Sequence, residues 1–146
     1  MVFWKAFICI TLLLVGCKNA DKNKNGLEGN TSNESAISDG QYCFQNEYPY
    51  QNSPSKNDVL ELNLEIKGNN VSGVYNWLPA EKDQRKGSLN GTIEDKTITA
   101  QYKYMQEGTE HTVEMKILLM EGKAQVLGGQ PELGLNTTID QIECVG

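Results

Sequence analysis

Hydrophobic and polar residues alternate along most of the chain beyond residue 40, which is the spacing of a β-strand that buries one face. In residues 58–67, Leu60, Leu62, Leu64 and Ile66 fall on one face and polar residues fall on the other. No window of the sequence has the spacing of an amphipathic helix. The alternation predicts about eight strands, at residues 42–45, 58–67, 71–78, 88–93, 97–104, 112–119, 123–127 and 138–145.

Short turn sequences separate these runs, so neighbouring strands are expected to pair as antiparallel hairpins. This all-β, eight-stranded meander with one apolar face resembles the calycin and lipocalin barrels, and we expect a closed or partly closed barrel. Closure would remove exposed sheet edges, whereas a two-sheet sandwich is the alternative. Gly73 and Gly91 lie inside predicted strands and are expected to mark the sharp bends of a small barrel.

The first 16 residues have the features of a secretory signal peptide. Lys5 lies near the start, and residues 6–15 are almost wholly apolar. This run is too short to span a bilayer, which takes about 20 residues in a helix. We therefore predict an N-terminal signal helix that is removed. No second apolar stretch follows, so no transmembrane helix is expected after maturation.

The end of the signal carries a more specific motif. Leu14-Val15-Gly16-Cys17 resembles the lipobox of bacterial lipoproteins, in which a small residue precedes the modified cysteine. The resemblance implies that Cys17 is joined to a diacylglycerol, that the chain is cut before it, and that fatty acids such as palmitate anchor it to a membrane. An ordinary signal peptide with a chance cysteine is the alternative.

The residue after the cysteine bears on the location. Lys18 follows Cys17, whereas Asp at that position retains enterobacterial lipoproteins at the inner membrane. By this analogy we expect a cell-envelope protein anchored to the outer membrane, on its periplasmic face or at the surface. Asn, Lys, Gly, Ser and Asp dominate the following segment, which is typical of a disordered tether. The predicted organisation is a signal peptide at 1–16, a lipidated tether at 17–40 and a β-domain at 41–146.

The charge of the chain restricts its partners. It contains 13 basic and 19 acidic residues, a formal net charge of −6, and loss of Lys5 with the signal makes the remainder more acidic. An acidic domain repels phosphate backbones, so nucleic acid is not expected as a partner. A basic partner fits this charge, although the same charge would also serve only to keep a secreted domain soluble.

Two of the four cysteines are expected to form a disulfide. Cys9 is lost with the signal, Cys17 takes the lipid, and Cys43 and Cys144 remain in the first and last predicted strands. Exported compartments are oxidising, so the remaining pair is predicted to link the strands that close the barrel. A metal or redox pair is the alternative.

The sequence has no recognisable catalytic motif. His111 is the one histidine, and no nucleophile elbow, phosphate loop or dinucleotide fingerprint is present. We therefore expect no enzyme activity, no cofactor and no metal site, with His111 at the surface or at the edge of the core. A hydrolase that uses loop carboxylates is an alternative, because Glu81, Asp83, Glu107 and Glu110 lie in or near predicted loops.

Two segments are candidates for binding. In the first, an aromatic strand end runs into a loop of mixed charge at residues 76–87, although a solvated loop with a core tryptophan would look the same. In the second, two tyrosines precede an acidic turn, although core tyrosines are an alternative explanation. The candidate residues are Trp77, Glu81, Lys82, Asp83 and Arg85 in the first segment and Tyr102, Tyr104 and Glu107 in the second.

The layout of the chain resembles that of small calycin-like envelope lipoproteins. This resemblance implies a barrel that binds a small apolar ligand in its mouth or an envelope protein on its loops. Membrane-bound lysozyme inhibitors are similar in plan, since Tyr42-Cys43 and Cys144 match their paired cysteines and acidity suits a cationic enzyme. The chain lacks the Ser/Gly-Lys loop of that family, so inhibition is kept as an alternative.

Overall fold

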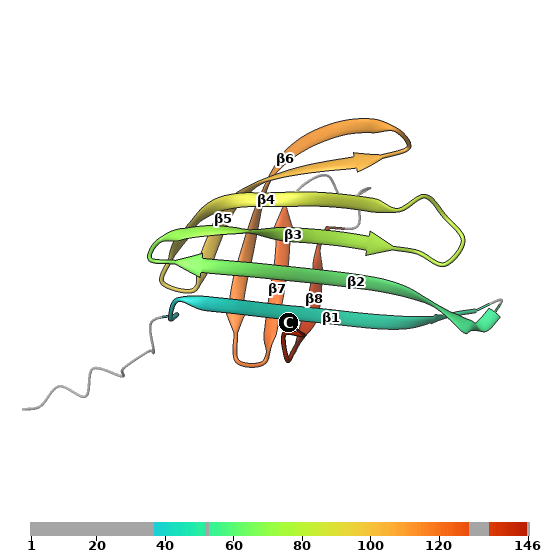
Figure 1. The fold of residues 1–146 in the computed structure, drawn as a ribbon, viewed down its shortest axis with the longest axis horizontal. Coiled ribbons are helices and arrows are strands. Elements are labelled where there is room, and N and C mark those ends of the chain that lie inside the picture. The colour runs from blue at the N-terminus through green and yellow to red at the C-terminus, as the bar shows by residue number, and fades with distance from the viewer. Residues whose placement is uncertain (1–36, 52, 129–134, 146) are drawn as a thin grey trace, which may run out of the picture. The chain divides into compact units, whose positions relative to one another are not determined.

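The computed structural model describes residues 37–51, 53–128 and 135–145, which belong to one compact unit spanning residues 34–146. Eight antiparallel strands form a closed barrel in sequence order, as the sequence predicts (Figure 1). In these residues no helix is long and apolar enough to cross a membrane. The strands are β1 (Gly40–Tyr50), β2 (Ser53–Lys67), β3 (Asn70–Leu78), β4 (Arg85–Glu94), β5 (Thr97–Gln106), β6 (Thr109–Met120), β7 (Lys123–Gly128) and β8 (Thr137–Ile142).

Several strands are longer than the hydrophobic alternation predicts. β1 continues to Tyr50, β2 begins at Ser53, and β4 begins at Arg85. These extra residues are mostly polar, and they are extended because each pairs with its neighbour in a long hairpin. The last strand is the exception, because β8 ends at Ile142 and Cys144 lies beyond it. The prediction that Cys144 is part of the last strand is therefore wrong.

The interior of the barrel is filled by its own side chains. Alternate residues of every strand point inward and form one hydrophobic core. Tyr75, Tyr102 and Phe44 are among the largest fully buried side chains. The Tyr102 hydroxyl donates a hydrogen bond of 2.7 Å to the Tyr75 carbonyl, which connects β5 to β3 across the interior. The inward face is therefore a packed core, as in other small barrels.

Glycines inside the strands allow close approach between neighbours. A Cβ on Gly73 would overlap the carbonyl oxygen of Asn63, and one on Gly91 would overlap that of Thr99. A Cβ on Gly87 would meet the ring of Tyr102. A side chain at any of these positions would push two strands apart, which explains why strand interiors contain glycine here.

The first and last strands meet along a short seam. β1 pairs with β8 at Cys43 and Phe44. Beyond that point, the Asn46 side-chain amide donates to the Thr138 carbonyl at 2.8 Å, and its oxygen accepts from the Asp140 amide at 3.0 Å. Where the two strands separate, the Asn46 side chain thus forms the hydrogen bonds to β8 that backbone groups of a paired strand would otherwise form.

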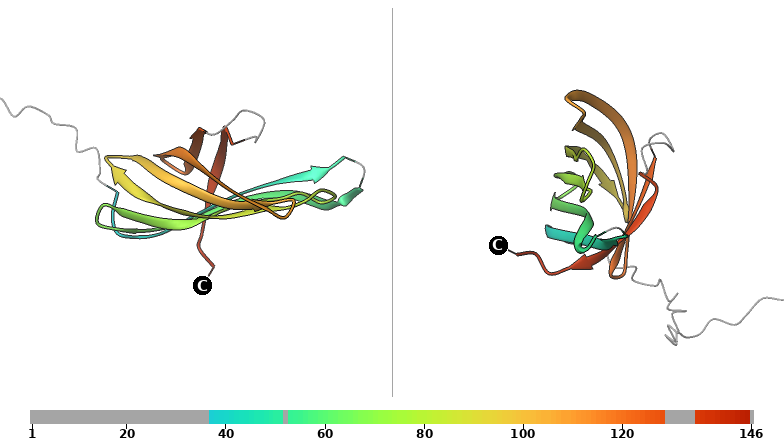
Figure 2. Two further views of the ribbon diagram at one scale, coloured as in Figure 1. Left: turned by 90° about the horizontal axis from the view of Figure 1, so that it is seen from above. Right: turned by 90° about the vertical axis from the view of Figure 1, so that its right-hand side faces the viewer.

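The two ends of the barrel differ. One end, which we call the near end, contains the start of β1 at Gly40 and the tight turns that join β2 to β3, β4 to β5 and β6 to β7. At this end the Asp39 carboxylate accepts a hydrogen bond of 2.8 Å from the Gly68 amide. At the other end, which we call the projecting end, the β1–β2, β3–β4 and β5–β6 hairpins extend past β7 and β8 (Figures 1 and 2). Away from the near end, β1 and β8 are paired no further than Phe44, and the described pairs between β6 and β7 run from Met120 to Met115.

Candidate functional site

An aromatic cluster around one arginine lies inside the barrel toward the projecting end. Arg85 is opposite Trp77 in the β3–β4 pair, and its guanidinium carbon lies 5.7 Å from the centre of the Trp77 ring. The same carbon lies 5.8 Å from the centre of the Tyr104 ring. The Tyr104 ring stacks on Tyr102 at 4.9 Å, and Tyr102 meets Tyr75 at 5.5 Å. We call these five side chains the arginine cluster.

Four of the five side chains of the arginine cluster are buried, and Trp77 is half-buried. Arg85 is only 3% exposed, and contact with two ring faces partly replaces the hydration that its charge loses. Burial raises the pKa of Tyr75 to about 12 and also raises the pKa of Tyr102, although the nearby Arg85 charge opposes both shifts. Both hydroxyls therefore stay protonated at physiological pH. Tyr102 uses its proton in the bond to β3, whereas the Tyr75 hydroxyl has no hydrogen bond of ordinary geometry in the described chain.

The structure joins parts of the two predicted binding segments. Trp77 and Arg85 from the first and Tyr102 and Tyr104 from the second all belong to the arginine cluster. Arg85 is in β4, not in a loop, and its side chain points inward with the odd-numbered residues of that strand. The predicted loop of mixed charge is therefore shorter than expected, because β4 begins at Arg85, and the two tyrosines are buried core residues, as the alternative explanation has it. The period-two pattern of residues 85–93 was the signal that could have placed Arg85 inside.

The acidic and basic loop candidates lie away from the arginine cluster. Glu81, Lys82, Asp83 and Glu107 are all exposed. Glu81 forms an ion pair with Lys56 on β2, and Glu107 occupies the β5–β6 turn with a φ of 52°. The loop carboxylates considered for a hydrolase are thus spread over two hairpins. In the described ranges, no three His, Cys, Asp or Glu side chains lie close enough together to hold a metal ion.

The predicted disulfide is present. Cys43 and Cys144 are bonded, their Cα atoms lie 5.2 Å apart, and 101 positions separate them in sequence. The bond holds the chain beyond β8 against β1 at the seam. Cys17, the predicted lipid attachment point, lies outside the described residues.

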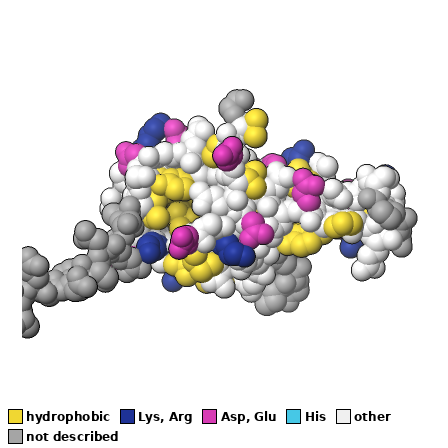
Figure 3. Space-filling view, turned by 90° about the horizontal axis from the view of Figure 1, so that it is seen from below, with side chains coloured by type: hydrophobic (Ala, Val, Ile, Leu, Met, Phe, Trp, Pro, Cys, Tyr) yellow, Lys and Arg dark blue, Asp and Glu magenta, His cyan; other side chains and the backbone are white. Residues whose placement is uncertain are grey.

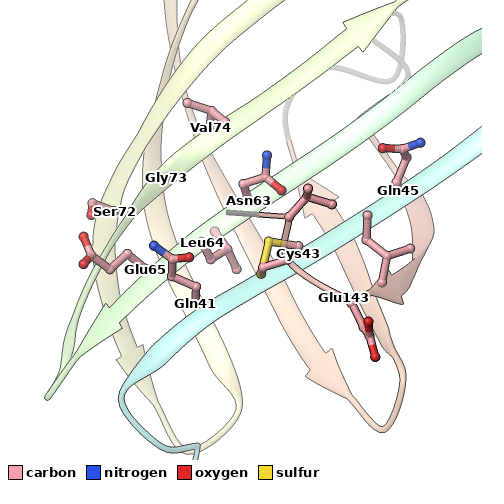
Figure 4. A pocket seen from close by; sticks show the side chains of 13 residues that line it. Gln41, Cys43, Gln45, Asn63, Leu64, Glu65, Ser72, Gly73, Val74 and Glu143 are labelled. Carbon is pink, nitrogen blue, oxygen red and sulfur yellow. A yellow bond between two sulfur atoms is a disulfide. The ribbon is translucent and has the colours of Figure 1, made fainter.

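A hollow of about 470 Å³ lies on the outer wall of the barrel beside the disulfide (Figure 4). It is lined by outward-facing residues of β1, β2 and β3 and by the chain after β8, including Gln41, Asn63, Glu65 and Glu143. The sequence did not predict it, because it forms where the C-terminal residues fold back over β1. Acidic and basic side chains are interspersed on the face shown in Figure 3, and the hydrophobic ones form separate patches.

His111 lies near the start of β6. His111 is exposed, as predicted, and its ring stacks on Tyr104 at 5.2 Å. The residues on either side, from 109 to 114, are exposed apart from half-buried Val113. They lie beyond Met115, the last residue of β6 for which a pair with β7 is described.

Comparison with known proteins gives no relative. No protein-family model, no curated protein and no solved structure matches the chain.

Proposed function

We propose that the chain is a non-enzymatic, lipid-anchored envelope protein whose barrel binds a partner at its projecting end. The lipobox-like sequence at Cys17 supports the anchor, and Lys18 supports the outer membrane as its location. Anchoring by Cys17 would attach the chain at the near end, since residues 37–40 enter the barrel there.

One observation carries the proposal: at the end opposite Gly40, three hairpins continue past the last described pairs that close the barrel. A long hairpin that only completed the core would not need to continue past its neighbours. Tyr48 and Met105, which are 48% and 46% exposed, lie on these extensions. Exposed aromatic and methionine side chains on a rigid scaffold are common in binding surfaces.

A protein partner fits this arrangement better than a small apolar ligand held inside. The inward positions that would line a ligand chamber are occupied by buried core side chains. The Tyr75, Tyr102 and Tyr104 rings also fill the interior toward the projecting end. The prediction of a ligand in the barrel mouth therefore has less support than the prediction of an envelope protein on the loops.

A photo-crosslinking comparison tests this function. A photoreactive amino acid is placed at Met105 on the projecting end and, in a second variant, at exposed Lys67 near the other end. We expect discrete crosslinked products in intact cells from Met105 and few from Lys67, because partner contact is confined to the hairpins. Equal products from both positions, or products from Lys67 alone, would exclude the projecting end as the binding surface.

A further inference from the structure

The hollow beside the disulfide is a formed depression that partner binding at the projecting end does not use. Its volume of about 470 Å³ is within the range of small-molecule sites. Thirteen residues line it, and all of them belong to the described part of the chain. Its floor is the outward face of β1, β2 and β3, and its wall is the chain from Ile142 to Val145. We call it the wall hollow.

Exposed apolar side chains gather in the wall hollow. The strand register places Cys43 between Ile142 and Asn63, and it pairs Asn63 in turn with Val74. Val74, Ile142 and Val145 are three of the seven large hydrophobic residues that are exposed in the described chain. With the disulfide they give the hollow an apolar portion, which favours contact with the hydrocarbon part of a ligand.

The charged groups of the wall hollow are all of one sign. Glu65 on β2 and Glu143 in the wall are its acidic residues, and its described lining includes no Lys, Arg or His. The two glutamates lie on opposite sides of the disulfide (Figure 4). Because β1 lies between them, two strand spacings, about 10 Å, separate them across the sheet. This arrangement attracts cations and repels anions.

Both carboxylates are accessible to a ligand. Glu143 is exposed, and it belongs to none of the ion pairs between described residues. Glu65 contacts Lys67 at 2.7 Å, but the two side chains are 44% and 73% exposed. An ion pair this exposed contributes little to stability, so a ligand cation can take the place of Lys67.

Neutral polar groups between the carboxylates add hydrogen-bond acceptors. Gln41 pairs with Glu65 in the β1–β2 register, and Glu65 pairs with Ser72 in the β2–β3 register. The side-chain oxygens of Gln41, Asn63 and Ser72 all line the hollow. An ammonium group has three N–H donors and no acceptor, so it requires such oxygens in addition to a carboxylate.

We infer that the wall hollow binds a free linear aliphatic diammonium or polyammonium ion. Its ammonium groups contact Glu65 and Glu143, and its methylene chain crosses the disulfide between them. An anion is repelled, whereas a neutral chain leaves both carboxylates without a counter-ion. The net charge of −6 favours approach of such a ligand. The hollow lies at the seam between β1 and β8, so its occupancy does not require the partner proposed for the projecting hairpins.

Titration calorimetry with ligands of one chain length tests the charge selection. The full chain in non-ionic detergent is titrated with hexamethylenediamine, hexylamine, hexanediol and adipate. We expect the diamine to bind at least about tenfold more tightly than hexylamine, because its second ammonium group binds intramolecularly. Hexanediol and adipate should give no measurable binding. The affinity of the diamine should fall as salt increases.

Matched variants separate this site from general attraction to an acidic chain. Glu143→Gln preserves the size of the side chain and removes its charge. Glu94→Gln removes the same charge from an exposed position on β4 outside the hollow and is the control. We expect at least about fivefold weaker diamine binding in Glu143→Gln and unchanged binding in Glu94→Gln, because only the first loses an ammonium contact. Circular dichroism verifies that both variants are folded.

Nuclear magnetic resonance locates the ligand on the protein. We expect hexamethylenediamine to shift the side-chain amide signals of Gln41 and Asn63, which line the hollow, and to leave that of Gln101 on β5 unchanged. Shifts at Gln101 without shifts at Gln41 and Asn63 would overturn the site. Equal diamine affinity in the two glutamine variants would also overturn it. Equal binding of hexylamine would exclude a contact with two carboxylates, and binding of hexanediol or adipate as tight as that of the diamine would exclude selection for cations. Absence of diamine binding would exclude this ligand class.

Discussion

Tyr75 and Tyr102 are both completely buried, but their hydroxyl groups are in different situations. The Tyr102 hydroxyl donates to the Tyr75 carbonyl at 2.7 Å. The Tyr75 hydroxyl makes no comparable bond among the described residues. Removing the hydrogen-bond donor of a buried carbonyl lowers the free energy of unfolding, whereas removing a hydroxyl that has no hydrogen bond changes it little. Equal burial therefore does not mean an equal contribution to stability.

The two corresponding phenylalanine variants measure this difference. Tyr102→Phe leaves the Tyr75 carbonyl without that donor, and we expect it to lower the free energy of unfolding by about 1–2 kcal/mol. Tyr75→Phe is the matched control and should change it by less than about 0.5 kcal/mol. Urea denaturation followed by tryptophan fluorescence gives both values. A larger loss in Tyr75→Phe than in Tyr102→Phe would contradict the assignment of the hydrogen bond.

At the scale of strands, the sequence predicts the fold well and the strand ends poorly. Inward residues such as Leu62 and Ile98 alternate with polar ones, so their strands could be located from hydrophobicity. Asn46 and Lys56 lie in strand extensions that bury little, and only pairing with a neighbour makes them extended. Arg85 was assigned to a loop because its charge does not signal an inward position. In each of these cases, pairing with a neighbouring strand determines the conformation of the residue, and the local hydrophobic pattern does not indicate it.

Asn46 is the clearest example of a polar residue that closes the structure. Its side chain makes one hydrogen bond to the Thr138 carbonyl and one to the Asp140 amide. We expect Asn46→Ala to lower the free energy of unfolding by about 1–2 kcal/mol, because two backbone groups of β8 lose a partner. Asn90→Ala, at an exposed asparagine of β4, is the control and should change it by less than about 0.5 kcal/mol. Similar losses in both variants would show that the Asn46 side chain does not hold the seam.

At the scale of the whole molecule, the barrel is anchored at one end in our proposal and binds at the other. The arginine cluster can be predicted in part, since four of its members are candidates in two separate segments, whereas Tyr75 is not a candidate. Their meeting inside the barrel depends on the order of β3, β4 and β5 around the sheet.

The anchor has its own test in the intact chain. We expect Cys17→Ala to abolish incorporation of labelled palmitate and to leave an uncut precursor, because the modified thiol is absent. Cys43→Ala is the matched control and should be labelled normally, since its cysteine belongs to the disulfide. Normal labelling of Cys17→Ala would show that the lipobox resemblance is coincidental.

If the chain is exported as we propose, the seam between the first and last strands also sets the order of events during secretion. A chain that crosses a membrane from its N-terminus exposes β1 long before β8, and Cys43 long before Cys144. Until the last residues arrive, β1 lacks one neighbour and Cys43 lacks its oxidation partner. Contacts between segments so distant in sequence form late in folding, and open strand edges favour aggregation in the interval. Under the proposed export, translocation of the final residues is therefore the step at which this protein depends most on chaperones and on a supply of oxidant.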